Sequence, residues 1–322
     1  QEYIRKTLET NEPTAYETFS DVVCQGYCYG PVSKYKMAVV APVVLNTTFR
    51  GNLKDSVFFN GNNGLFAHAL ANYITANGGE IVYDTAVTHF ADGQVDTDKG
   101  TYKADAIICA ARISGKLLQG IAPDMSFDCP YTCFYNSVVE LDRAPAAPNG
   151  ENEWGAVFYL PDETLPYQVL SSVNIADMIG KNIDGRYINL NIIDRTENGP
   201  LSKEKLFSAI EKNLKTIFPD AAPLLITESV HWRETMPVAE ESFIEKIREI
   251  QGKNNIWFAG DFLGSPSMET ALRTGIMAAE KIIQPDSALA KKNKKKVNYP
   301  HYPGTPEACH ETRSLDFKKW TF

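Results

Sequence analysis

The stretch Asn254–Ile283, NNIWFAGDFLGSPSMETALRTGIMAAEKII, predicts a buried strand, a tight turn and a helix. Its apolar run Ile256–Ala259 is typical of a strand that is covered on both faces. Gly260 allows the backbone to turn, and Asp261 follows at the carboxyl end of the strand. The segment Ser265–Ser267 then indicates a helix start, because serine caps helices and proline suits the first helical position.

The turn and the helix start together form a place where a ligand can bind. A carboxylate accepts hydrogen bonds from hydroxyl groups, and the free N–H groups at a helix amino-terminus attract negative charge. Ala271, Gly275 and Ala278 recur at helical spacing, so a flat group or another backbone can approach that face of the helix. These residues leave two interpretations open, a ligand site or an ordinary strand–turn–helix with a capping aspartate.

The segment resembles the carboxyl-terminal FAD-binding motif of the flavin amine oxidase, protoporphyrinogen oxidase and phytoene desaturase superfamily. The resemblance implies that Asp261 holds the ribityl chain of FAD and that the helix amino-terminus points at the pyrimidine edge of the flavin. The helix dipole then stabilises the negative charge of reduced flavin near N1. The cofactor-binding residues that the resemblance implies in this segment are Gly260, Asp261, Ser267, Met268, Glu269 and Thr270.

Residues 56–121 match the same superfamily a second time, in the expected order along the chain. The sequence predicts a helix over Leu65–Asn77 that ends at Gly78-Gly79, and then a strand over Glu80–Tyr83. A hairpin over residues 94–103 and a buried strand over residues 104–111 follow. By resemblance, the backbone of Val87 contacts the adenine of FAD. A generic helix and β-meander is the alternative, but two matches in the expected order favour the superfamily.

Residues 122–250 are predicted to form a substrate domain. Strands are expected over residues 132–141, 155–160, 168–174, 186–193 and 226–232, which indicates a mostly antiparallel sheet. A helix over Lys203–Phe218 is expected to pack on it. The superfamily uses such a sheet to line the substrate cavity, although core packing is the commoner role of an aromatic side chain. The candidate cavity residues are Asn136, Trp232, Met236, Tyr135 and Tyr159.

The expected fold class is therefore mixed α/β and α+β. A partial FAD-binding Rossmann-like domain is joined to a substrate domain with a mostly antiparallel sheet. Residues 1–55 and 122–250 are assigned to the substrate domain, and residues 56–121 and 251–285 to the FAD-binding part. Residues 286–322 are expected to form an extended tail.

Composition limits the possible partners. The chain has 322 residues, of which 43% are hydrophobic, and a net charge of −8, which argues against nucleic acid as a partner. No apolar run approaches the length of a membrane span. The Cys-x3-Cys pairs at 24/28 and 129/133 lack a matching histidine cluster, so no metal site is expected. His68, His89 and His231 are isolated along the chain and are expected to be structural.

The sequence departs from the superfamily at two points. The G-x-G-x-x-G fingerprint and its βαβ unit occur nowhere in it, so the expected sheet lacks its central strands. We therefore expect a second polypeptide to supply that half, either a fragment of a cleaved precursor or a separate subunit. Amine oxidases usually place a lysine near flavin N5, whereas Asn136 aligns near that position here. This difference favours a desaturase-like or porphyrinogen-oxidase-like enzyme.

Three functions remain open at this point. The first is that the chain is part of an FAD-dependent oxidoreductase that abstracts hydride from a C–H or C–N bond of a small organic substrate. Alternatively, it is a non-catalytic binding or scaffold protein derived from such an enzyme, or a flavin-supported isomerase or cyclase. Because flavin accepts the hydride, such enzymes need few acid–base groups, and the sequence assigns no catalytic residue.

Overall fold

The computed structural model describes residues 64–283, apart from residues 119–120, 122–128, 147–154, 160–161, 163, 176–184, 197, 239–240 and 265. The expectations for residues 1–55 and 286–322 lie outside the described residues. The described residues fall into two compact units, one over residues 87–279 and one over residues 64–86 with 280–283.

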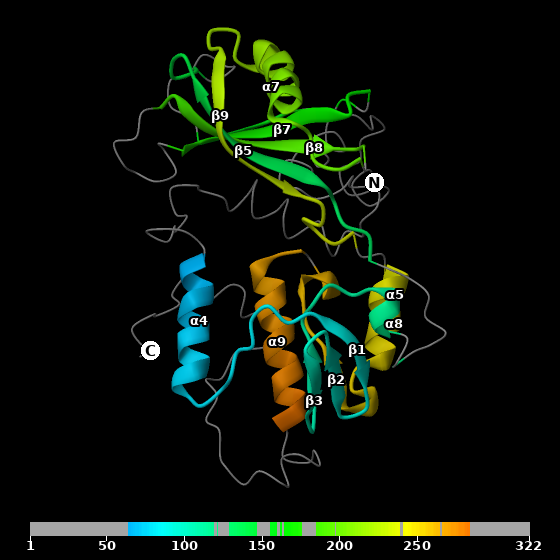
Figure 1. Cartoon of the computed structure of the whole chain (residues 1–322). Coiled ribbons are helices and arrows are strands. Elements are labelled where there is room, and N and C mark those ends of the chain that lie inside the picture. The colour runs from blue at the N-terminus through cyan, green and yellow to red at the C-terminus, as the bar shows by residue number, and fades with distance from the viewer. Residues whose placement is uncertain are drawn as a thin grey trace, which may run out of the picture. The chain divides into compact units, whose positions relative to one another are not determined.

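A five-stranded antiparallel sheet in the order β6-β7-β8-β5-β9 forms the predicted substrate domain (Figure 1). Its strands are β5 (Phe134–Leu141), β6 (Ala156–Phe158), β7 (Tyr167–Asn174), β8 (Tyr187–Asp194) and β9 (Pro223–Trp232). Burial alternates strictly along β8, as expected for a strand with two different faces. The prediction of a mostly antiparallel sheet is confirmed, and β9 begins three residues earlier than expected.

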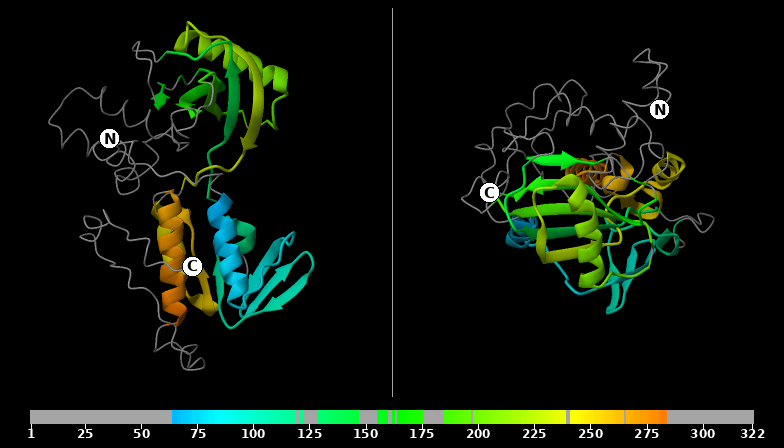
Figure 2. Two further views of the ribbon diagram at one scale, coloured as in Figure 1. Left: turned by 90° about the vertical axis from the view of Figure 1, so that its left-hand side faces the viewer. Right: turned by 90° about the horizontal axis from the view of Figure 1, so that it is seen from above.

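Helix α7 (Lys203–Ile217) covers one face of this sheet, as the views in Figure 2 show. Ser202 caps the helix, because its hydroxyl accepts a hydrogen bond from the N–H of Lys205 at 3.4 Å. The buried residues of the helix are those predicted from the periodicity, namely Leu206, Ile210, Leu214 and Ile217. They pack on sheet residues that include Val139, Ile188 and Ile192. The opposite face of the sheet is not covered by α7.

The predicted FAD-binding part contains a second core around two parallel strands, β4 (Ile107–Cys109) and β10 (Ile256–Phe258). Helix α8 (Glu241–Ile250) buries Phe243, Ile244, Ile247 and Ile250 in this core, beside the short helix α5 (Gly115–Leu118). The 3-10 turn η4 (Lys253–Asn255) leads into β10. The side-chain amide of Gln251 donates to the carbonyl of Phe258 and accepts from its N–H, which joins α8 to the end of β10.

Strands β1 (Val87–Ala91), β2 (Gln94–Thr97) and β3 (Gly100–Lys103) form a separate antiparallel sheet. The second hairpin has the predicted turn, in which Gly100 follows Asp98 and Lys99. Phe90 of β1 is buried in the core of the predicted FAD-binding part, so the hairpins pack on it by this side chain.

The second unit contains helix α4 (Gly64–Ala76), which confirms the predicted helix. Gly78 ends it in a left-handed conformation with φ 82°, and the N–H of Gly79 donates to the carbonyl of Ile74 at 2.9 Å. The expected strand over Glu80–Tyr83 was wrong, since these residues form no strand. A strand requires a hydrogen-bonded neighbour, and no strand of the described residues pairs with this segment.

Candidate cofactor and substrate site

The turn after β10 has a backbone conformation that requires glycine. Gly260 has φ 157° and ψ 168°, and a Cβ at this position would lie 2.3 Å from the ring of Phe262. Phe262 is 2% exposed and is therefore held in place. Asp261 follows and opens the short 3-10 turn η5 (Asp261–Leu263), as the sequence predicted for the end of the strand.

The carboxylate of Asp261 lies half-buried at this turn. Burial raises its pKa above the ordinary value, and backbone N–H groups, including that of Phe262, partly oppose the rise. Burial also raises the pKa of the nearby Cys129 to about 12, and the negative charge of Asp261 adds to that effect. A half-buried carboxylate is stabilised when a hydroxyl group donates a hydrogen bond to it.

Helix α9 (Met268–Ile283) begins seven residues after Asp261 along the chain. Ser267 caps it, because the hydroxyl of Ser267 accepts a hydrogen bond from the N–H of Thr270 at 3.1 Å. The N–H groups of Met268 and Glu269 have no partner within the helix, and the Met268 side chain is 69% exposed. The helix start is thus suited to bind a negatively charged or acceptor group.

Thr274 fixes helix α9 to the glycine turn. Its hydroxyl accepts a hydrogen bond from the N–H of Gly260 at 2.9 Å and lies 2.8 Å from the carbonyl of Thr270. This contact holds the carboxylate turn and the helix amino-terminus in one arrangement. Thr274 was not among the residues predicted from the sequence, although its position one turn after Thr270 on the helix was a signal that could have identified it.

Val87 occupies the first position of β1 and is 39% exposed. It lies in the three-stranded hairpin sheet, whereas Asp261 follows a strand of the two-stranded parallel sheet. Its contact with adenine stays a prediction.

The face of the five-stranded sheet opposite α7 carries a row of amide side chains. The side-chain nitrogen of Asn136 donates to the side-chain oxygens of Asn189 at 3.1 Å and Asn191 at 2.8 Å. The nitrogen of Asn191 donates in turn to the hydroxyl of Ser171 at 2.9 Å. Asn189 and Asn191 were missed from the sequence, although polar residues at alternate positions of an apolar strand indicate a polar face.

The other candidate cavity residues lie in different surroundings. Trp232, at the end of β9, is 53% exposed, and Met236 is partly buried where its backbone pairs with that of Thr132. Tyr135 is 2% exposed in the core under α7, and Tyr159 packs against that core. This placement favours core packing for the two tyrosines, which is the alternative that the sequence analysis left open.

Residues 38–281 match the family described as FAD dependent oxidoreductase (DAO). The chain belongs to this family. The resemblance to flavin oxidoreductases is confirmed, and FAD is the cofactor of the family. A comparison with curated proteins found no match.

Solved structures of this FAD-dependent oxidoreductase fold are similar to the chain at low sequence identity. A fatty acid isomerase from P. acnes matches with a TM-score of 0.51 and 13% identity over 75% of this chain. Reduced UDP-galactopyranose mutase matches with a TM-score of 0.53 and 12% identity over 76% of this chain. The chain spans 58% of the length of each of these two structures. Putrescine oxidase bound to putrescine matches with a TM-score of 0.51 and 12% identity, over 86% of this chain and 66% of that chain.

The residues of this FAD-dependent oxidoreductase chain fit one part of the cofactor. Asp261 is a half-buried acceptor of the kind that a ribityl hydroxyl requires, and the first turn of α9 has N–H groups of the kind that bind an acceptor edge. The fingerprint that binds the pyrophosphate is not in the sequence. No helix of the described residues is long and apolar enough to cross a membrane.

Proposed function

We propose that this chain is part of a flavin-dependent enzyme that removes hydride from a C–H bond of a small organic substrate, including a C–H bond next to a nitrogen, in which case the C–N bond is oxidised. The observation that supports this most is the turn after β10, where a half-buried Asp261 and the open start of α9 are joined through Thr274. Bound FAD supplies the redox chemistry, because its ring accepts the hydride. The task of the chain is to hold the ring and to orient the substrate in a site without bulk water.

Each cofactor-binding residue has its own role in this proposal. Asp261 accepts a hydrogen bond from a ribityl hydroxyl, and this bond compensates the cost of burying its charge. The N–H groups of Met268 and Glu269 stabilise negative charge at the pyrimidine edge of the flavin. The hydroxyl groups of Ser267 and Thr270 hydrogen-bond to each other and stabilise the first turn of α9. The backbone of Val87 contacts the adenine of FAD.

Substrate contact is assigned to the sheet face that α7 does not cover. Asn136, with Asn189 and Asn191, presents amide groups there that can orient a polar part of a substrate. Trp232 adds an exposed aromatic surface at the edge strand β9. Met236 lies in the segment that leaves this strand.

A second polypeptide segment that carries the βαβ unit is proposed to complete the FAD-binding part. Helix α4 has no buried residue among those described, and its apolar side chains Leu70, Tyr73 and Ile74 are 43–56% exposed. Ile108 in the middle of β4 is 40% exposed, and β4 pairs only with β10 among the described strands. Apolar surface and unpaired strand edges of this kind favour a further partner.

Native purification tests the partner. Size-exclusion chromatography with mass analysis should find this chain together with a segment that contains the dinucleotide-binding fingerprint. A folded, monodisperse chain of 322 residues that binds FAD without any such segment would contradict the proposal.

Anaerobic addition of substrates to the native protein tests the reaction. Lasting loss of the oxidised flavin absorption, restored by an electron acceptor, is expected for net removal of hydride. Native protein without bound flavin would exclude this function and favour a scaffold protein.

Flavin-supported isomerisation is a second candidate, because two of the similar structures are an isomerase and a mutase. In that case substrate is converted while the oxidised flavin absorption recovers without any added acceptor. Product analysis by mass separates the two candidates, since an isomer has the mass of the substrate and an oxidised product has lost two hydrogens.

A further inference from the structure

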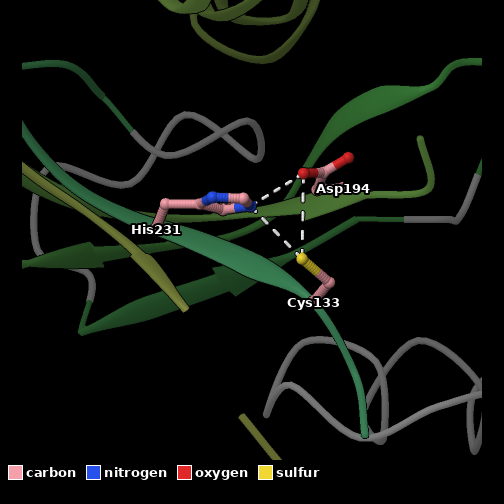
Figure 3. A group of neighbouring side chains, drawn as sticks. All are labelled: Cys133, Asp194 and His231. Atoms are coloured by element: carbon pink, nitrogen blue, oxygen red, sulfur yellow. Dashed lines mark hydrogen bonds and ion pairs between the residues drawn. The ribbon is translucent and has the colours of Figure 1, made fainter. Parts of the chain in front are cut away.

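Away from the residues assigned to FAD, three side chains with metal-binding atoms meet at one end of the five-stranded sheet (Figure 3). Cys133 directly precedes β5, Asp194 is the last residue of β8, and His231 is the last but one of β9. Strand β5 lies between the other two, and its register places His231 opposite Tyr135. The N–H of Asp194 donates to the carbonyl of Cys133 at 3.1 Å. The strand pairing itself therefore brings the three side chains together.

The three ligand atoms are close enough to share one ion. Nε2 of His231 lies 3.2 Å from Sγ of Cys133 and 2.8 Å from Oδ2 of Asp194, and Sγ and Oδ2 are 3.7 Å apart. Around a tetrahedral zinc ion, with bonds of about 2.0 Å to nitrogen and oxygen and about 2.3 Å to sulfur, such atoms lie roughly 3.3–3.6 Å apart. Shifts of about half an ångström or less convert the observed spacing into that geometry.

The arrangement does not suit a nucleophilic cysteine. A catalytic cysteine or serine uses one ring nitrogen of histidine, and a carboxylate orients the ring through the other nitrogen. Here Cys133 and Asp194 both approach the same nitrogen, Nε2 of His231, as Figure 3 shows. Three ligand atoms directed at one point are the geometry of ion binding.

Neighbouring groups hold two of the ligands in place, as is usual around metal sites. Oδ1 of Asp194 accepts hydrogen bonds from the N–H of Thr196 at 2.9 Å and from its hydroxyl at 2.7 Å, so Oδ2 remains directed at the cluster. The ring of His231 stacks on Tyr135 with centroids 4.2 Å apart, and the hydroxyl of Tyr135 accepts from the N–H of Leu201 at 2.6 Å.

The charges also fit a divalent cation. The side chains of Asp194 and His231 are 1% and 10% exposed. A thiolate, a carboxylate and a neutral imidazole carry two negative charges, and Zn²⁺ cancels both in a place where an uncompensated charge is costly.

We propose that Cys133, Asp194 and His231 bind a zinc ion, with water as the fourth ligand, and that the ion joins the ends of β5, β8 and β9. A mixed set of sulfur, nitrogen and oxygen ligands suits Zn²⁺ better than Mg²⁺ or Ca²⁺, which prefer oxygen ligands. Since Cys133 and His231 must lose protons to bind, zinc affinity falls as the pH is lowered.

Metal titration of the reduced, chelator-treated native protein tests the proposal. One equivalent of Zn²⁺ should bind and raise the melting temperature. One equivalent of Co²⁺ should give a thiolate-to-cobalt charge-transfer band, which reports that a cysteine is a ligand. Cys133→Ser should abolish this band, and His231→Gln and Asp194→Asn should weaken Zn²⁺ binding at least about 100-fold. Thr196→Val should weaken it by about 10-fold, because it removes the hydroxyl that donates to Oδ1 of Asp194 and leaves the backbone N–H donor of residue 196 in place.

His89→Gln is the matched control. His89 lies 3.4 Å from Asp96 in an exposed pair without a cysteine, so its loss should leave the titration unchanged. If a variant of the cluster fails to fold, the Co²⁺ spectrum of the wild-type protein still decides. Wild-type protein that binds no stoichiometric Zn²⁺, or a Co²⁺ spectrum without a thiolate band, would overturn the proposal and leave a metal-free hydrogen-bonded cluster.

Discussion

Replacing Gly260 by alanine perturbs the turn on which the proposed cofactor site depends. The added Cβ would lie 2.3 Å from the ring of Phe262 in a backbone conformation that side chains rarely adopt. Phe262 is 2% exposed and packs edge to face on Phe243, with ring centroids 6.2 Å apart. The ring therefore has a packed neighbour that opposes its displacement.

The expected loss has two parts. Backbone strain of this kind costs about 1–3 kcal/mol, and forcing an extra carbon into a packed core costs about 1–3 kcal/mol. Gly260→Ala should thus lower the free energy of unfolding by about 2–6 kcal/mol. Urea titration of the native protein, followed by tryptophan fluorescence, measures this change as a lower midpoint at an unchanged slope. Flavin release should occur at the same lower urea concentration.

Two further variants separate the causes. Gly275→Ala adds the same carbon inside α9, where nothing lies within 4 Å, and should raise stability by up to about 1 kcal/mol. Phe262→Leu in the Gly260→Ala background should recover part of the packing loss, which appears as a coupling between the two substitutions. If Gly260→Ala unfolds at the wild-type urea concentration and retains flavin, the reasoning about this turn is wrong.

Three more substitutions test separate features. Leu214→Ala in α7 should lower the free energy of unfolding by about 2–5 kcal/mol, because Leu214 is buried against the sheet. Lys215→Ala, the control, should change it by less than about 0.5 kcal/mol. Equal urea midpoints for the two variants would contradict the assignment of Leu214 to the buried face of α7. Ser267→Ala should cost about 0.5–2 kcal/mol through the lost cap of α9 and should speed flavin release, which stopped-flow absorbance would detect. Burial raises the pKa of Asp261 above 3.8. The carboxylate of Asp261 therefore lowers the free energy of unfolding as the pH rises from below 3.8 through the pKa of the folded protein. Asp261→Asn lacks this contribution to the pH dependence. For flavin-free protein, the urea midpoint of Asp261→Asn should therefore exceed that of the wild type at neutral pH, and the excess should disappear in acid; an excess that persists in acid would refute the assignment.

The sequence predicted those helices and strands whose apolar residues follow a regular pattern within one short stretch of the chain. The buried face of α7 and the strand at Ile256 follow from periodicity and from a continuous apolar run, and both are present. Helix α8 was missed, although Phe243, Ile247 and Ile250 recur at helical spacing and provided the signal.

Other features depend on contacts between distant parts of the chain. The segment Glu80–Tyr83 has the composition of a strand, but a strand forms only with a neighbour, and none of the described strands pairs with it. Cys133 and His231 are far apart in the sequence, and spacing along the chain gave no reason to join them. Only the register of β5 with β8 and β9 places them together, although His231 is isolated along the chain.

The flavin content of the natively purified protein tests the central claim most directly. We expect one FAD for each chain in the wild-type protein, measured from the absorption spectrum and the protein concentration, and a large loss of bound FAD in Asp261→Asn despite an intact fold. Wild-type protein that is folded and contains no FAD, or an Asp261→Asn variant that retains FAD as tightly as the wild type, would contradict it.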